Sequence, residues 1–173
     1  MLYETDTKNL IPFLEKALNY AKEFGADQSE ISASYTTGFI TTVRKQIVDS
    51  LENTQDKSIS INVYCNKHKG SSSTSDFSDD AIKMSVKRAC EIAKFTSKDK
   101  FAGLADIKYL TPNNLNLDLY HPWKELNTLK AIDIATECEA HALSNKQISN
   151  TEGATIESYN SVYAQANSHG FMH

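Results

Sequence analysis

The stretch Ser58-Ile-Ser-Ile-Asn-Val-Tyr-Cys65 gives the clearest structural signal in the chain. From Ile59 onward every second residue is apolar, which is the period of a strand with one buried face. Residues 67–70 have the composition of a turn, and residues 71–75 are expected to return as a polar strand. Because this connection is short, the two strands are predicted to be antiparallel.

Further strand-like segments lie on both sides of this pair. Gly38 is interpreted as a turn that separates two of them. Residues 46–52 either extend the strand before them or form a separate strand. The remaining predicted strands are residues 31–35, 40–44, 148–154 and 161–167.

Helices are predicted where apolar residues recur every three or four positions. The first such pattern runs from Leu10 to Ala21. Thr7 is its predicted N-cap, Pro12 suits its first turn, and Gly25 suits the left-handed position that ends a helix.

The second helix has the clearest start signal. Ser78 is its predicted N-cap, and Asp79 and Asp80 place negative charge at the positive end of the helix dipole. A third helix is predicted over roughly residues 123–143, with Cys138 on its buried face.

The element order is one helix, several strands, two helices and further strands. This order predicts an α+β fold, with a mainly antiparallel sheet and about three helices packed on one face. We expect residues 1–173 to form a single domain. Because the last predicted strand is followed by no capping signal, we expect this domain to be a piece of a longer protein.

The charge balance and the cysteines limit the class of protein. With 18 Lys and Arg against 22 Asp and Glu, the net charge is -4, so the chain lacks the basic surplus that nucleic-acid binding uses. No apolar run approaches the ~18 residues of a membrane span, and no secretory signal is visible. Three widely spaced cysteines indicate reduced thiols. We expect a cytoplasmic protein that contacts neither nucleic acid nor membrane.

One histidine pair approaches the spacing of a zinc-protease motif. In His169-Gly-Phe-Met-His173 the spacing matches H-E-x-x-H, but Gly170 stands where the motif has its Glu base. In a strand, positions four apart are about 13 Å apart, which is too far for one metal ion. We therefore expect no metal ligand and no catalytic residue in this chain.

The serine-rich residues 71–75 are a second candidate for chemistry. They lack the glycines of a phosphate-binding loop and the strand–turn–helix setting of a nucleophilic serine. A polar strand with hydrogen-bonded hydroxyls explains them better. An autonomous hydrolase that uses these serines remains an alternative, in addition to the two hypotheses given at the end of this section.

Six phrases of the sequence carry a family resemblance. In their order and spacing they resemble the N-terminal part of the PmbA/TldD family, closer to its PmbA (TldE) branch. The phrases begin at Val43, Ile61, Ala93, Leu117, Asn150 and Asn167, the last reading Asn-Ser-His-Gly-Phe.

The resemblance implies a longer cytoplasmic bacterial subunit, of which residues 1–173 are the N-terminal domain and the C-terminal half is absent from this chain. Such subunits are linked to proteolysis of small or unfolded peptides and, by name, to modulation of DNA gyrase. The resemblance also implies a TldD-type partner in a heterodimer, with a homodimer as the alternative. The zinc of such an assembly belongs to an H-E-x-x-x-H helix of the TldD-type partner. That motif does not occur in these 173 residues, so no catalytic or metal-binding residue is carried over.

Our first hypothesis is an N-terminal domain that helps to enclose the peptide in a metalloprotease without a zinc site of its own. The sequence leaves open whether the chain itself is an enzyme. Ser168, His169 and Gly170 are the candidate contacts to a neighbouring domain or a peptide groove. A sheet edge would also allow strand addition to an extended peptide. The alternative is a non-enzymatic adaptor that binds a protein partner, in the gyrase-modulator role.

Overall fold

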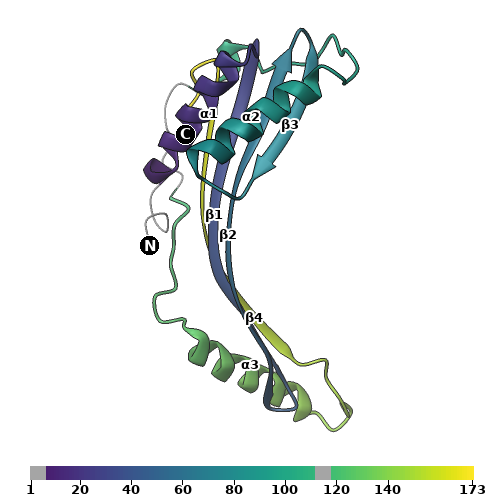
Figure 1. The fold of residues 1–173 in the computed structure, drawn as a ribbon. Coiled ribbons are helices and arrows are strands. Elements are labelled where there is room, and N and C mark those ends of the chain that lie inside the picture. Colours follow the sequence, from purple (N-terminus) through teal and green to yellow (C-terminus); the bar gives the residue numbers. More distant parts are fainter. Residues whose placement is uncertain (1–6, 112–117) are drawn as a thin grey trace. The chain divides into compact units, whose positions relative to one another are not determined.

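The alternating stretch of residues 58–65 lies in a four-stranded sheet in the computed structural model of the protein, which describes residues 7–111 and 118–173. The order across the sheet is β3-β2-β1-β4. The strands are β1 (Gln28–Arg44), β2 (Ile47–Cys65), β3 (His68–Thr74) and β4 (Ala154–Asn167). The helices are α1 (Ile11–Glu23), α2 (Asp79–Ala93) and α3 (Thr128–Leu143), with short 3-10 helices at Thr7–Asn9 and Ile107–Tyr109 (Figure 1).

This architecture confirms the predicted α+β class with its mainly antiparallel sheet and three helices. The chain divides into two compact units. The first unit comprises Met1–Tyr35, Asp56–Asn116 and Ser161–His173, and the second comprises Thr36–Gln55 and Leu117–Asn160. Among the described residues, no helix is long and apolar enough to cross a membrane.

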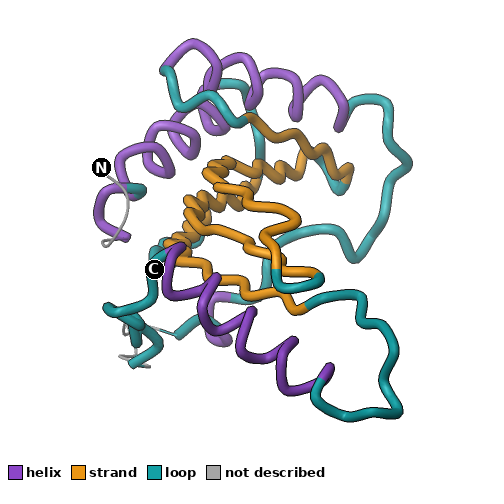
Figure 2. The backbone as a smooth tube through the Cα atoms, turned by 90° about the horizontal axis from the view of Figure 1, so that it is seen from below, coloured by secondary structure: helices purple, strands orange, loops and turns teal. Residues whose placement is uncertain are grey.

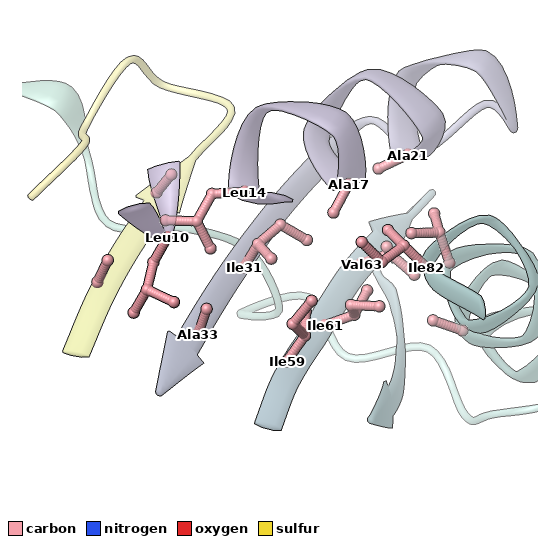
Figure 3. Close-up of a cluster of buried hydrophobic side chains, with 14 of the residues drawn as sticks. Leu10, Leu14, Ala17, Ala21, Ile31, Ala33, Ile59, Ile61, Val63 and Ile82 are labelled. Carbon is pink, nitrogen blue, oxygen red and sulfur yellow. The ribbon is translucent and has the colours of Figure 1, made fainter. Parts of the chain in front are cut away.

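The core of the first unit lies between its sheet and two helices. Ile59, Ile61 and Val63 are at most 1% exposed, as the alternation predicts. They share one apolar cluster with Leu14 of α1 and Val86 of α2. Figures 1 and 2 show these two helices beside each other on one face of the sheet, and Figure 3 shows the side chains between them. The sequence pattern therefore assigned the correct face of β2 to the core.

The helix ends agree with the sequence in part. Ser78 caps α2 by accepting a hydrogen bond from the Ala81 amide, and Gly25 has the expected positive φ of 83°. The predicted N-cap Thr7 is wrong, because α1 begins after Leu10. Thr7 instead starts a 3-10 turn in which its carbonyl accepts from the Leu10 amide at 2.9 Å.

Gly38 is not a turn, because β1 continues through it. A Cβ at this position would lie 2.5 Å from the carbonyl oxygen of Ser158 and would collide with the Tyr159 ring. Glycine is needed here for close approach of a neighbouring strand. The reversal comes at Lys45 and Gln46, whose φ values of 52° and 62° suit a two-residue hairpin turn. Residues 47–52 therefore belong to the separate strand β2 rather than to an extension of β1, and Gln46 lies in the turn.

The next turn also lies earlier than predicted. Asn66 and Lys67 have φ values of 49° and 69° and connect β2 to β3, so Gly70 lies inside β3. A Cβ on Gly70 would collide with the carbonyl of Ala89 and would lie 2.7 Å from the Ala93 amide, both in α2. As at Gly38, a glycine that looks like a turn signal in the sequence permits close packing.

Three predictions for residues 123–154 need correction. The third helix begins at Thr128 rather than near residue 123, because the side chain of Asn127 accepts from the Lys130 amide at 2.9 Å and caps it. Cys138 is exposed, whereas Glu139 beside it is buried. Residues 148–153 are not a strand, so the two predicted final strands reduce to β4.

Candidate functional site

The candidate residues Ser168, His169 and Gly170 form a tight turn after β4, in the first unit. The side-chain oxygen of Asn167 accepts from the amides of His169 at 2.9 Å and Phe171 at 3.2 Å. Gly170 has a φ of 91°, which favours glycine, and its amide donates to the Asn167 carbonyl at 3.1 Å. The turn is thus held by one asparagine side chain and one glycine.

After the turn the chain pairs with the outer edge of β4. Gln165 and His173 exchange two backbone hydrogen bonds, at 2.6 and 2.9 Å, and the Asn167 amide donates to the Phe171 carbonyl at 2.9 Å. The predicted strand of residues 161–167 is confirmed as the second half of β4, which is the last strand in the order. Beyond Asn167 the chain turns back on its own strand.

Ser168 fixes the start of the turn to β1. Its amide donates to the Ser29 carbonyl at 2.9 Å, and its side-chain oxygen accepts from the Ser29 amide at 3.0 Å. Ser29 is only 3% exposed. The hydroxyl of Ser168 therefore accepts the hydrogen bond that a backbone carbonyl would accept in the regular ladder.

His169 connects β1 to the loop around residues 102–106. Its Nδ1 lies 3.0 Å from the Ala105 carbonyl and must donate to it, whereas its Nε2 lies 3.2 Å from the side-chain nitrogen of Gln28. The Gln28 side-chain oxygen accepts in turn from the Leu104 amide at 2.8 Å. A neutral imidazole with its proton on Nδ1 satisfies all three contacts.

A hollow of about 220 Å³ lies beside this turn. Its lining is mainly apolar, with the imidazole rings of His169 and His173 at the same place. The apolar lining residues are Ile107, Leu110, Phe171 and Met172. Such a hollow suits one apolar side chain of a neighbouring segment better than a charged group.

The described residues do not fit a zinc site. Across residues 7–111 and 118–173, no group of three or more His, Cys, Asp or Glu is placed to hold a metal ion. His169 points to the Ala105 carbonyl, and His173 has its Nε2 3.4 Å from the Thr111 carbonyl. Two serines of β3 also have hydrogen-bond acceptors. Ser71 donates to Asn62 and Ser72 donates to the Ser85 carbonyl, both at 2.7 Å.

Glu139, which sequence reasoning missed, is a buried carboxylate of the second unit. It is 2% exposed, and its two oxygens accept from the amides of Lys45 and Gln46 at 2.8 Å, from the Gln46 side chain at 3.0 Å and from the Thr151 hydroxyl. These hydrogen bonds lower the pKa of Glu139 to about 2, and the bond from Thr151 contributes most to this shift.

The sequence did contain a signal for this residue. Ala131, Ala135 and Glu139 recur at steps of four and are the buried residues of α3. A carboxylate in the third position of such a row must find donors, and the backbone amides of a hairpin tip with positive φ supply them.

Comparison with known proteins places these features in a family context. Residues 29–93 match the family model described as PmbA/TldA metallopeptidase domain 1. The chain is 38% identical over 163 residues to Metalloprotease PmbA of Escherichia coli O157:H7, which covers 92% of this chain and 36% of that protein. It thus spans roughly a third of the length of this relative.

Two solved structures share the fold. One, from Bacteroides thetaiotaomicron and described as a proposed modulator of DNA gyrase, has a TM-score of 0.83 at 19% identity, over 96% of this chain and 38% of that one. The other, TldE from Thermococcus kodakarensis, has a TM-score of 0.74 at 17% identity, over 93% and 36%. At these identities the likeness shows the fold alone.

Proposed function

Because the chain belongs to the PmbA/TldD metallopeptidase family and carries its first domain, we propose that it is the N-terminal domain of a PmbA-type subunit that helps to enclose small unfolded peptides. In this proposal a TldD-type partner holds the zinc ion and performs the hydrolysis. The present chain supplies a wall and contacts between domains or subunits, in the cytoplasm.

The observation that carries this proposal is the set of hydrogen bonds made by the turn after β4. Ser168 and His169 direct their polar atoms to Ser29, Gln28 and Ala105 of the same unit. Polar groups that hold backbone in place are typical of a scaffold, whereas a catalytic centre gathers them around a shared open space. The apolar hollow beside the turn then suits a side chain from the C-terminal half of the subunit or from a peptide.

The test is reconstitution with full-length subunits. The PmbA-type subunit that contains this domain is mixed with a TldD-type subunit, and hydrolysis of an unfolded peptide is followed together with size-exclusion chromatography. We expect a heterodimer and hydrolysis only in the mixture. If the PmbA-type subunit alone hydrolysed the peptide as fast as the mixture, the proposal would be overturned. A homodimer of the PmbA-type subunit that does not bind the TldD-type subunit would support the alternative assembly.

A non-enzymatic adaptor is the second candidate, favoured by the fold shared with the protein described as a proposed gyrase modulator. With a net charge of -4, such an adaptor would contact the gyrase protein rather than its DNA. Binding of purified gyrase in the absence of any TldD-type subunit, combined with no effect on peptide hydrolysis, would favour this candidate.

A further inference from the structure

Residues 47–54 of β2, in the second unit, form an open sheet edge. β3 pairs with β2 only from Ile59 to Cys65. On the side of β2 away from β1, the described part of the chain offers residues 47–54 no backbone hydrogen-bond partner. Unpaired amides and carbonyls in a row are a template for another strand.

At two places on the other edge strands, the chain itself supplies hydrogen-bond partners. At the end of β4, Gln165 and Asn167 are paired with the residues after the turn. At β3, the Lys69 carbonyl accepts from the Thr96 hydroxyl at 3.0 Å. The edge of residues 47–54 thus differs from these two places.

The side chains of this edge are unusual for a strand that stays in water. Ile47, Val48 and Leu51 are 72%, 42% and 44% exposed. The segment contains neither lysine nor proline, the residues that most often protect a free edge. Its only charged residues are Asp49 and Glu52, so the edge is apolar and acidic.

The hairpin turn next to this edge is also held in one conformation by the chain itself. Glu139 holds the amides of Lys45 and Gln46 at the adjoining hairpin turn. A hollow of about 300 Å³ next to the turn is lined by Arg44, Lys45, Ile47, Val48 and Asp49. A preorganised strand loses less conformational entropy on binding than a mobile one.

We propose that residues 47–54 bind, by strand addition, an extended apolar peptide that carries two basic residues three positions apart. Backbone hydrogen bonds supply affinity for any extended segment. Asp49 and Glu52 lie three positions apart and therefore on opposite faces of the strand. Each selects for a Lys or Arg directly across from it, and the exposed apolar side chains accept the residues between these two. The inference rests on the proposed peptide-enclosing function, because it names the class of peptide that this domain would hold.

The charges also disfavour a second copy of the chain that pairs in full register as the occupant. If two copies of residues 47–54 paired antiparallel in full register, Asp49 of each would lie opposite Glu52 of the other. Like charges that face each other across strands are destabilising. A basic peptide meets the same two carboxylates with attraction.

The test measures binding to the PmbA-type subunit alone, without cleavage. The probes are three fluorescein-labelled peptides, read by fluorescence anisotropy: a Lys-Val peptide of sequence Val-Lys-Val-Val-Lys-Val, a Glu-Val peptide with Glu in place of each Lys, and the backbone N-methylated Lys-Val peptide. We expect binding of the Lys-Val peptide only, because the N-methylated peptide keeps its side chains but cannot donate to the edge. Equal binding of the N-methylated peptide, or none of the Lys-Val peptide, would refute strand addition.

Variants and hydrogen exchange locate the site. Asp49→Lys combined with Glu52→Lys should weaken Lys-Val binding about tenfold, since each reversal removes an attraction and adds a repulsion. Glu15→Lys with Glu91→Lys, at exposed helix positions of the first unit, changes the net charge equally and should leave binding unchanged. Amide protection should appear at residues 47–54, and protection at residues 154–160 instead would contradict the assignment.

The outcome is separable from that of the proposed function. If the Lys-Val peptide fails to bind but the subunit still activates a TldD-type partner, only this inference fails. If the peptide binds at residues 47–54 but no activation occurs, the proposed enzymatic role fails and the edge remains a peptide site.

Discussion

Glu139 accepts two hydrogen bonds from Gln46, one from the backbone amide at 2.8 Å and one from the side-chain amide at 3.0 Å. This contact joins α3 to the hairpin turn between β1 and β2. It stabilises a turn in which both residues have positive φ, a conformation that lysine and glutamine rarely adopt.

The first prediction is that Glu139→Gln lowers the thermal midpoint by several degrees at neutral pH. A pKa that folding lowers from 4.5 to about 2 means that Glu139 stabilises the fold above pH 4.5 and loses this effect as the pH falls toward 2. The difference between wild type and Glu139→Gln should therefore shrink in acid. Thermal unfolding followed by circular dichroism across this pH range measures it.

Glu137→Gln is the matched control, because Glu137 lies on the same helix with its side chain 74% exposed, 3.8 Å from His141. It should change the midpoint little, since exposed ion pairs contribute about 0–1 kcal/mol. If both variants behave alike at every pH, Glu139 does not hold the hairpin turn.

A second prediction concerns the buried hydroxyl of Thr41 in β1. Thr41 is 0% exposed, and within the described residues its Oγ1 has no hydrogen-bond partner. Because an unsatisfied buried polar group is costly, Thr41→Val should raise the free energy of unfolding by about 1 kcal/mol. Thr42→Val, which removes a 3.0 Å contact with the Thr155 hydroxyl, should not stabilise. A lower stability of Thr41→Val in urea titration would indicate a partner for this hydroxyl.

A third prediction tests the close contact between β3 and α2. Gly70→Ala should destabilise the protein by about 1–3 kcal/mol, because the added methyl group collides with the backbone at Ala89. Ser73→Ala, at an exposed position of the same strand, is the control and should be nearly neutral. Urea unfolding of both variants decides the matter, and equal stability would mean that β3 and α2 are farther apart.

A fourth prediction addresses His169. His169→Ala removes the contacts with the Ala105 carbonyl and with Gln28, each worth about 0.5–1.5 kcal/mol. Hydrogen exchange should accelerate at residues 102–106, while the core of β2 stays protected. The exposed His141 provides the control variant His141→Ala. Unchanged exchange at residues 102–106 in His169→Ala would show that the imidazole does not anchor this loop.

Local patterns were sufficient for much of the fold. The alternation around Ile61 identified both the strand and its buried face, and Ser78 with the two aspartates after it located the start of α2. In these cases the determining interactions lie within a few residues, so the sequence pattern records them directly.

The errors arose where a distant contact decides the local structure. Gly38 resembles a turn residue, but its role is to admit Tyr159 from β4. Glu139 resembles a solvent-facing residue, but its partners Lys45 and Gln46 lie 94 and 93 positions earlier in the chain. For the candidate site, Gly170 was recognisable as a turn residue, whereas the pairing of His169 with Gln28 depends on the same kind of distant contact.

The central claim is that this domain belongs to a subunit that takes part in peptide hydrolysis without holding the metal ion. Zinc analysis of the separated PmbA-type and TldD-type subunits, after purification as an active complex, tests it most directly. We predict one zinc ion in the TldD-type subunit, none in the subunit that carries this domain, and loss of hydrolysis when the two are separated. Stoichiometric zinc in the PmbA-type subunit, together with hydrolysis by that subunit alone, would contradict the account.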